Sequence, residues 1–443
     1  MFMNKKQVLV LASLFLSVFA WSQTPMSLSA AKEYAVQHAF LVKNTDFSAQ
    51  VAKLQTQELI AIGLPQISGS VQYQNFIDRP TSILPGDFFG MPGQQVAVQF
   101  GVPQQMTAGI SASQLLFDGS WLVGLQASKA YAAMQQKQVQ KSQIDVKRST
   151  EDAYHLAVIA DESVALLISA RDVLQSTLEN TKALSKEGFV ESQDVDQLQL
   201  SLNELNNRIR TAEMQRGIAL DLLKFTIGMP IENEIVLTDN SQAVLDSFNS
   251  MLLQNPFNSD VLVDNLITKD AIALQKLNVK NQQARLLPNA AAFYNLQRQA
   301  LRQEFDFFDG SQSWYPTQIW GISINVPILS GGAKMRGIQK AGVEVKRMEE
   351  TLAYSTNASK LEYKSAMAEY VNATQSVTLA KQSYDLANSI LTKTQVKFDE
   401  GTVSSFELSR QTSQLIQAQV SLLQARLSLM NAQTRLSKSF NAL

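Results

Sequence analysis

Residues 320–332, Trp320-Gly-Ile-Ser-Ile-Asn-Val-Pro-Ile-Leu-Ser-Gly-Gly332, decide how the rest of the chain is interpreted. From Trp320 to Ile328 every second residue is large and apolar, and the residues between them are small or polar. This alternation predicts a β-strand with one apolar face. Strands of about ten residues with aromatic residues near one end, here Trp314 and Tyr315, are typical of lipid-facing barrel strands. The alternation fits a half-buried strand of a soluble sheet equally well.

The same stretch has a counterpart earlier in the chain. Gly109-Ile-Ser-Ala-Ser-Gln-Leu-Leu-Phe-Asp-Gly119 aligns with residues 321–331, which lie 212 positions later. The run that begins Glu187-Gly188 aligns with Glu400-Gly401, 213 positions later, and Leu64-Pro65 aligns with Leu287-Pro288, 223 positions later. Three landmarks in the same order at nearly one spacing predict a tandem duplication.

Each copy is expected to contain a helix, two strands and a long helical hairpin. A proline ends the first helix of each copy, because the residue before proline disfavours the helical conformation. The expected elements are a helix at 28–64, a strand at 66–76, a Gly/Pro-rich loop at 77–106, a second-copy helix at 260–287 and a shorter loop at 298–317. The expected divisions are a signal peptide at 1–22, a first structural repeat at 23–230, an inter-repeat equatorial segment at 231–258 and a second structural repeat at 259–443.

The helical part of each copy contains no proline over roughly 70 residues, from Gly119 to Gly188 and from Gly331 to Gly401. A continuous helix of that length reaches about 100 Å, which is longer than a globular core requires. Apolar and small residues recur at alternating steps of three and four, the spacing of coiled coils. The first copy has Val195, Leu198, Leu202, Leu205, Ile209, Ala212, Arg216, Ala219 and Leu223; the second has Tyr370, Ala373, Val377, Ala380, Tyr384, Ala387, Leu391, Thr394 and Phe398, then Leu408, Gln411, Leu415, Ala418, Leu422, Ala425, Leu429, Ala432 and Leu436. Gly188 and Gly401 then mark the tips of two hairpins.

The N-terminus indicates the compartment of the protein, and the composition excludes several classes of function. Lys5 and Lys6 precede an apolar run that ends at Ala20, and small residues before Gln23 form a cleavage pattern, so we expect export. No later stretch approaches 18 consecutive apolar residues, so no transmembrane helix is expected. The net charge of -1, from 38 basic and 39 acidic residues, provides no field for nucleic acid. The absence of cysteine excludes disulfides, thiolate metal sites and a thioether lipid anchor.

Two strands per copy give four strands per chain, which is too few to close a barrel, because single-chain bacterial barrels begin at about eight strands. An open sheet in lipid would leave backbone groups unpaired. We therefore expect three chains to share one twelve-stranded barrel, with their hairpins forming a long α-helical tunnel. The expected fold class is mainly α with a small membrane β-barrel contribution.

The order of these features resembles the TolC family of outer-membrane efflux proteins. The resemblance rests on the signal peptide, the duplication, Leu64-Pro-Gln-Ile67, the Gly-Ile-Ser and Pro-Ile-Leu-Ser-Gly-Gly runs within 321–332, and the glycine-centred tips. It implies a homotrimeric outer-membrane channel with a periplasmic tunnel, in contact with outer-membrane lipid. It also implies a periplasmic adaptor (membrane fusion protein) and an inner-membrane transporter as partners, for efflux of drugs or other substrates or for type I secretion.

The resemblance also implies two sites at the hairpin tips. Acidic residues that follow the tip glycine form a periplasmic gate in the family, and the matching positions are Asp194, Glu407 and Arg410. Arg410 departs from the family's acidic pattern, so two interpretations of the gate stay open: a cation-selective ring of carboxylates, or salt bridges that hold a closed state. A solvated helix face is a third interpretation that accounts for all three residues. The implied adaptor-docking residues are Gly188, Gly401, Ser404 and Ser405.

The other classes of function have less support in the sequence. A periplasmic coiled-coil adaptor or scaffold also uses long hairpins, although it has no use for duplicated strands of this type. An enzyme is not expected, because the chain has no Gly-x-Ser-x-Gly, phosphate-loop or His-Glu-x-x-His motif. No catalytic, cofactor or metal site is expected either. His155 is expected to be an exposed helical histidine, and Asp306 and Asp309 to lie in an exposed loop rather than a calcium site.

Overall fold

The computed structural model describes residues 24–442, so the predicted signal peptide at 1–22 lies outside the described residues. The described part is mostly helical with few strands, as predicted. It divides into two compact units. The helical unit comprises residues 24–48, 136–267 and 352–442, and the sheet unit comprises residues 49–135 and 268–351.

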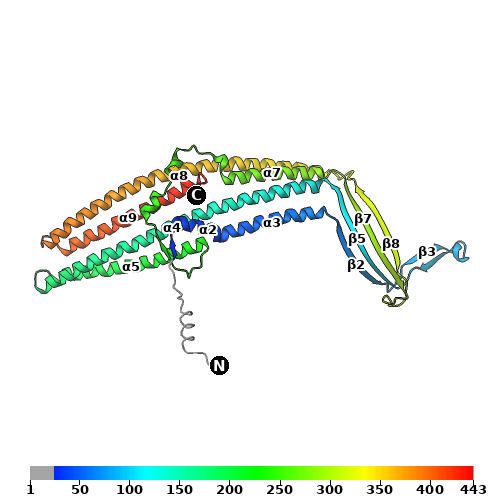
Figure 1. Cartoon of the computed structure of the whole chain (residues 1–443), viewed down its shortest axis with the longest axis horizontal. Coiled ribbons are helices and arrows are strands. Elements are labelled where there is room, and N and C mark those ends of the chain that lie inside the picture. The colour runs from blue at the N-terminus through cyan, green and yellow to red at the C-terminus, as the bar shows by residue number, and fades with distance from the viewer. Residues whose placement is uncertain (1–23, 443) are drawn as a thin grey trace, which may run out of the picture. The chain divides into compact units, whose positions relative to one another are not determined.

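Figure 1 labels the long helices, the strands of the main sheet and some of the shorter elements. In chain order the elements are β1 (Thr24–Met26), α2 (Leu28–His38), α3 (Phe40–Ile62), β2 (Gln66–Asn75), β3 (Thr81–Pro85), the 3-10 helix η1 (Gly86–Phe89), β4 (Gln95–Gln99), β5 (Gln104–Asp118), α4 (Gly119–Lys186), α5 (Ser192–Ile227), β6 (Ile235–Leu237), α6 (Ser241–Asp246), η2 (Ser250–Gln254), η3 (Ser259–Val261), α7 (Val263–Ala284), β7 (Asn289–Arg302), β8 (Tyr315–Asn325), α8 (Ala333–Asp399) and α9 (Ser405–Lys438).

The order of the elements repeats once along the chain. When the short strands β3 and β4 and the 3-10 helices are left out, the elements β1, α2, α3, β2, β5, α4, α5 are followed by β6, α6, α7, β7, β8, α8, α9. In this order β6 and α6, which fall in the segment 231–258, hold the places of β1 and α2. The order favours a second copy that starts near Ile235.

The sheet unit contains one four-stranded antiparallel sheet, in the order β2-β5-β7-β8 (Figure 1). The four long strands that the sequence predicts therefore pair with one another. Residues that are partners across the strands share a face: Ile67, Ala112, Tyr294 and Trp320 form one row, and Ser68, Ser111, Asn295 and Ile319 form the next row on the opposite face. Large apolar side chains on the first face are exposed, including Ile67 (73%) and Trp320 (78%).

The loop predicted at 77–106 was only partly correct, because it contains a second, smaller hairpin. Strands β3 and β4 pair antiparallel, and β5 already begins at Gln104. Gly86 begins the turn between β3 and β4, and a Cβ there would lie 2.3 Å from the Met91 carbonyl oxygen, so only glycine fits. The many glycine and proline residues in this segment predicted a loop, so the two strands of five residues were not predicted. The loop predicted at 298–317 is also shorter, because β7 extends to Arg302 and β8 begins at Tyr315.

The single helix predicted at 28–64 is two helices that meet at Ala39. Ala39 has extended backbone, with ψ 137°, and is 2% exposed. The C-terminal end of α5 packs against this break, where a Cβ on Gly228 would lie 2.5 Å from the His38 carbonyl oxygen. The two helices thus separate where the backbone of α5 packs closely against them. Neither α2 nor α3 contains a proline or glycine that would predict this break.

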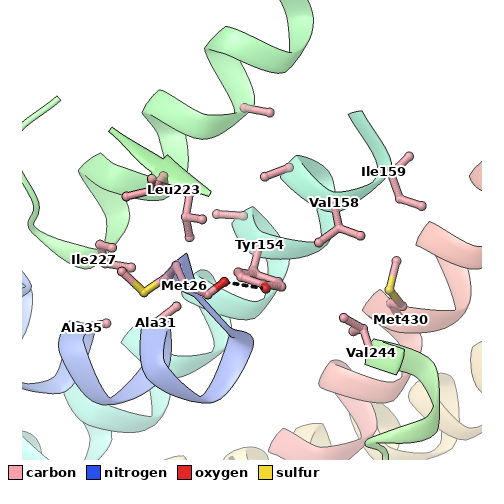
Figure 2. Packing of buried hydrophobic residues seen from close by; sticks show 14 of the residues in the cluster. Met26, Ala31, Ala35, Tyr154, Val158, Ile159, Leu223, Ile227, Val244 and Met430 are labelled. Carbon is pink, nitrogen blue, oxygen red and sulfur yellow. Dashed lines mark hydrogen bonds between the residues drawn. The ribbon is translucent and has the colours of Figure 1, made fainter. Parts of the chain in front are cut away.

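The core of the helical unit joins β1, α2, α4, α5, α6 and α9 (Figure 2). β1 pairs with β6 in parallel, so the start of the described chain is held by a strand more than 200 residues later. Tyr154 is fully buried, and its hydroxyl donates to the Met26 carbonyl oxygen at 3.0 Å and lies 3.1 Å from Asp239 Oδ2. The same Asp239 carboxylate accepts the backbone N–H of Leu28 at 2.8 Å.

His155 is the next residue on α4, and the prediction that it is exposed is wrong. It is 3% exposed, and its Nδ1 lies 3.1 Å from Asn431 Oδ1 on α9. Burial lowers the pKa of His155, because a charged imidazole is costly where water is excluded, while Asn431 and Glu151 oppose that shift. The residues next to His155 in the sequence do not indicate this contact, because its partner Asn431 lies on a distant helix.

The predicted coiled-coil spacing is confirmed in both hairpins. Leu198, Leu205, Leu408 and Leu429 are each buried, and α4 and α8 run for 68 and 67 residues. Arg216 is the exception in the predicted seam: it is exposed, and its Nε donates to Asp161 on α4 at 2.5 Å.

One helix among the described residues meets the length and composition required to cross a membrane. It is α4, and 39% of the qualifying window is buried inside the structure. The prediction from runs of consecutive apolar residues did not detect this window. Long core helices of soluble proteins meet the same criterion, so the window alone does not establish a membrane span.

Candidate functional site at the hairpin tips

The two hairpin tips have the same backbone geometry. Gly188 and Gly401 adopt positive φ angles of 79° and 71°, and no heavy atom lies within 4 Å of a Cβ built on either. At the first tip the N–H of Phe189 donates to the Leu184 carbonyl at 3.0 Å, and at the second the N–H of Thr402 donates to the Lys397 carbonyl at 2.9 Å. This pattern is the Schellman helix end, in which glycine is favoured for its left-handed conformation and not for lack of space.

The structure brings Asp194 and Ser405 together. Asp194 lies in the first turn of α5 and Ser405 begins α9, and the Ser405 hydroxyl donates to Asp194 Oδ1. Ser405 is 1% exposed, so its hydroxyl is enclosed between the two hairpins. A gate candidate of the first copy is therefore bonded to a docking candidate of the second.

A second polar contact lies further along the same two helices. The hydroxyls of Ser201 on α5 and Ser409 on α9 are 2.7 Å apart. Both contacts advance in the same direction along the chain, so α5 and α9 run in parallel at this end. Leu198 and Leu408, at 0% and 2% exposure, lie on the same helices and are buried. The sequence spacing identified the leucines, whereas the serines carried no recognisable signal.

Glu407 and Arg410 pair with each other on α9. Arg410 Nε lies 3.4 Å from Glu407 Oε2, and Gln411 Nε2 donates to Glu407 Oε1 at 2.6 Å. The Glu407 N–H also donates to Ser404 Oγ at 3.4 Å, so Ser404 caps this helix. An exposed pair three residues apart contributes only a few tenths of a kcal/mol. Its position in the first turn also favours the Glu407 carboxylate through the helix dipole.

The tips are acidic and carry exposed aromatic side chains. Residues 186–196 contain one lysine and four carboxylates, and residues 397–410 contain one lysine, one arginine and three carboxylates. Phe189 and Phe406 are 78% and 59% exposed. Gly188, Gly401 and Ser404 are exposed as well, whereas Ser405 is not. Within residues 24–442 the structure shows no cluster of His, Cys, Asp and Glu suited to a metal ion.

Solved structures share this fold along nearly the whole chain. CusC, whose structures concern folding and transmembrane channel formation, is 14% identical and covers 96% of this chain and 95% of its own, with a TM-score of 0.68. The outer membrane protein VceC of Vibrio cholerae is 13% identical over 94% of this chain and 96% of its own, with a TM-score of 0.67. The outer membrane channel CmeC of Campylobacter jejuni is 16% identical over 94% and 85%, with a TM-score of 0.65.

The fold is thus that of outer-membrane channels. Residues 271–442, which cover most of the second copy, match the outer membrane efflux protein family, and the predicted resemblance is confirmed. The predicted outer-membrane location, with the long helices on the periplasmic side, accords with the family match and with the shared fold. No characterised protein sequence matches the chain.

Proposed function

We propose that the protein is a homotrimeric outer-membrane channel, and that it serves as the exit duct of a tripartite efflux or type I secretion system. Substrates would enter from a periplasmic adaptor and an inner-membrane transporter and leave through a barrel shared by the three chains. The observation that carries this proposal is the open four-stranded sheet of β2, β5, β7 and β8.

The outer strands of this sheet support assembly with other copies. β2 and β8 each pair on one side only within the described chain. In lipid, unpaired backbone groups cost several kcal/mol each, so a spanning sheet must close on itself. Pairing β8 of one chain with β2 of the next removes every edge, and three chains supply twelve strands, within the range of known barrels.

The two faces of the sheet suit the wall of an aqueous barrel. The row that includes Ile67 and Trp320 is apolar, and the opposite face carries Ser68 and Ser111, whose hydroxyls are 2.8 Å apart. Barrel strands alternate between lipid-facing apolar residues and lumen-facing polar residues. The apolar face would therefore contact outer-membrane lipid.

The hairpin tips support a gate at the periplasmic end. The Asp194–Ser405 bond and the Ser201–Ser409 contact join the two hairpins of one chain, and we name these two contacts the tip latch. The surplus of carboxylates at each tip would concentrate cations around a narrow opening in a trimer. Opening then requires the hairpins to separate and the tip latch to break.

The same tips are the proposed docking surface for the adaptor. Gly188, Gly401 and Ser404 are exposed, and their small size permits close approach of another helical hairpin. Ser405 contributes through the tip latch, because it is buried. A Gly401→Trp variant should assemble normally and lose efflux-dependent drug resistance, and normal resistance would contradict docking at this tip.

Cysteine cross-linking tests the shared barrel, and the natural chain contains no cysteine to interfere. Pairs of cysteines are placed on β2, at Ser68 or Ser70, and on β8, at Thr317 or Ile319, one pair per variant. We expect one register to produce covalent dimers and trimers and no larger species. The control pair, Ser111→Cys with Asn295→Cys, replaces directly opposed residues of β5 and β7 and should cross-link within one chain.

A series in which the control pair cross-links but no edge pair joins two chains would contradict the shared barrel. It would favour the periplasmic coiled-coil scaffold, which needs no closed sheet. A ladder that continues past three chains would contradict the trimer.

A further inference from the structure

The sheet strands contain few charged residues, and only one of them has no partner. β2, β5, β7 and β8 carry Asp118, Arg298 and Arg302 and no other charged side chain. Asp118 accepts the backbone N–H groups of Ser120 and Trp121, and Arg302 Nε lies 3.0 Å from Asp306 Oδ1. Arg298 forms no hydrogen bond or ion pair with another described residue.

Arg298 lies on the apolar face of the sheet. Its partners across the strands are Ala108 on β5 and Pro316 on β8, and Ala108 pairs in turn with Val71 on β2. Val71 is 73% exposed. An exposed arginine among apolar side chains that are expected to face lipid is costly unless its charge is neutralised or reaches the membrane surface.

A groove of about 570 Å³ crosses the strands beside Arg298. Its lining residues include Gly69, Ser70, Val71, Ala108, Arg298 and Trp314. Gly69 and Ala108 leave room over the sheet, because they have little or no side chain. The groove is therefore mainly apolar, with one cation and one indole ring among its lining residues.

The height of Arg298 along its strand matches the outer headgroup level. Arg298 is nine residues beyond Asn289, the first residue of β7. That is about 30 Å along the strand and about 23 Å along the axis of a barrel whose strands tilt by roughly 40°. The apolar band of such barrels is about 25 Å tall. Trp314 precedes β8 at the same end of the sheet, and tryptophan is enriched where hydrocarbon meets headgroups.

We propose that this groove binds a lipid with a negatively charged phosphate headgroup in the outer leaflet. The Arg298 guanidinium binds the phosphate, for which its planar pair of N–H donors is suited. One acyl chain lies in the groove over Gly69 and Ala108. The site rests on the proposed function, because it needs the apolar face to contact lipid.

Native mass spectrometry of the purified, delipidated protein in detergent tests the site. The probes are phosphatidylglycerol and phosphatidylcholine with identical acyl chains, and inorganic phosphate as a competitor. The wild type should retain up to one phosphatidylglycerol per chain, and Arg298→Gln should weaken its binding about tenfold, as expected for a lost charge-assisted bond. Phosphatidylcholine should bind weakly to both.

Two further variants separate position from charge. Gln297→Arg combined with Arg298→Gln moves the charge to the opposite face of β7, because neighbouring strand residues alternate in direction, and should bind as weakly as Arg298→Gln. Arg347→Gln removes an arginine from α8 that pairs with Glu344, and should bind as the wild type does.

Equal affinity of the wild type for the two lipids, or an unchanged affinity in Arg298→Gln, would overturn the site. Displacement of phosphatidylglycerol by millimolar inorganic phosphate would overturn a lipid as the occupant. If Arg298→Gln does not assemble, the wild type still tests the site through its relative affinity for the two lipids and through the competition with inorganic phosphate. A wild-type mass of one chain would instead contradict the proposed channel.

Discussion

Removing the Ser405 hydroxyl should make the channel open more often. In Ser405→Ala the Asp194 carboxylate loses the donor that joins the two hairpins. A hydrogen bond to a charged group contributes about 1.5–3 kcal/mol, and we take the lower value because Asp194 is only partly buried and water can replace the donor. Since about 1.4 kcal/mol is a tenfold change in an equilibrium constant, the ratio of open to closed hairpins should rise about tenfold in each chain.

Single-channel recording in planar bilayers measures this ratio as the fraction of time spent in the conducting state. Ser404→Ala is the matched control, because the neighbouring Ser404 hydroxyl caps α9 and forms no hydrogen bond with a described residue of α5. Asp194→Asn should also raise the open fraction. The double variant should resemble Ser405→Ala, because Asp194→Asn only takes the charge from the acceptor of the bond that Ser405→Ala removes.

The reasoning is refuted if Ser405→Ala and Asp194→Asn both conduct as the wild type does. It is also refuted if Ser404→Ala raises the open fraction as much as Ser405→Ala, because the effect would then belong to helix capping.

Three further substitutions, and Tyr354→Phe as a control, test the packing and the pH dependence of the helical unit by denaturation in detergent. Tyr154→Phe should lower the free energy of unfolding by about 1–3 kcal/mol, because it removes the buried hydroxyl that bonds the Met26 carbonyl and the Asp239 carboxylate, whereas Tyr354→Phe, at 77% exposure, should change it by less than about 0.5 kcal/mol. Leu198→Ala should cost about 2–5 kcal/mol, because Leu198 is fully buried. The lowered pKa of His155 means that the unfolded chain binds a proton below a pH of about 6.5 while the folded chain does not. Stability should therefore fall as the pH drops through 6.5 toward the folded pKa, and His155→Gln should lose this part of the pH dependence. Equal pH profiles for the two proteins would contradict it.

The long helices and strands were predictable because each has a strong signal in its own stretch of sequence. Proline-free stretches with a three-and-four spacing predict the long helices, and the alternation around Trp320 predicts β8. The break at Ala39 has no local cause in the sequence, since alanine is the best helix former. The feature found beside the extended backbone of Ala39 is the close packing of Gly228, which is distant in the sequence. Strands β1 and β6 have three residues each, too few for a periodicity.

The sequence predicted the positions of the candidate site, and it did not predict the contacts between them. Gly188 and Gly401 are marked by the helix ends they form, and Asp194 and Glu407 by their places after them. The bond between Asp194 and Ser405 joins residues 211 positions apart, and nothing in either local sequence indicates it. His155 was missed for the same reason, because its partner Asn431 lies on another helix.

The mass of the protein in detergent tests the central claim most directly, since an open four-stranded sheet requires other copies to close. Multi-angle light scattering of the purified protein, corrected for bound detergent, gives the number of chains per particle. The shared barrel predicts a protein mass three times that of one mature chain. A particle that contains a single chain would contradict it.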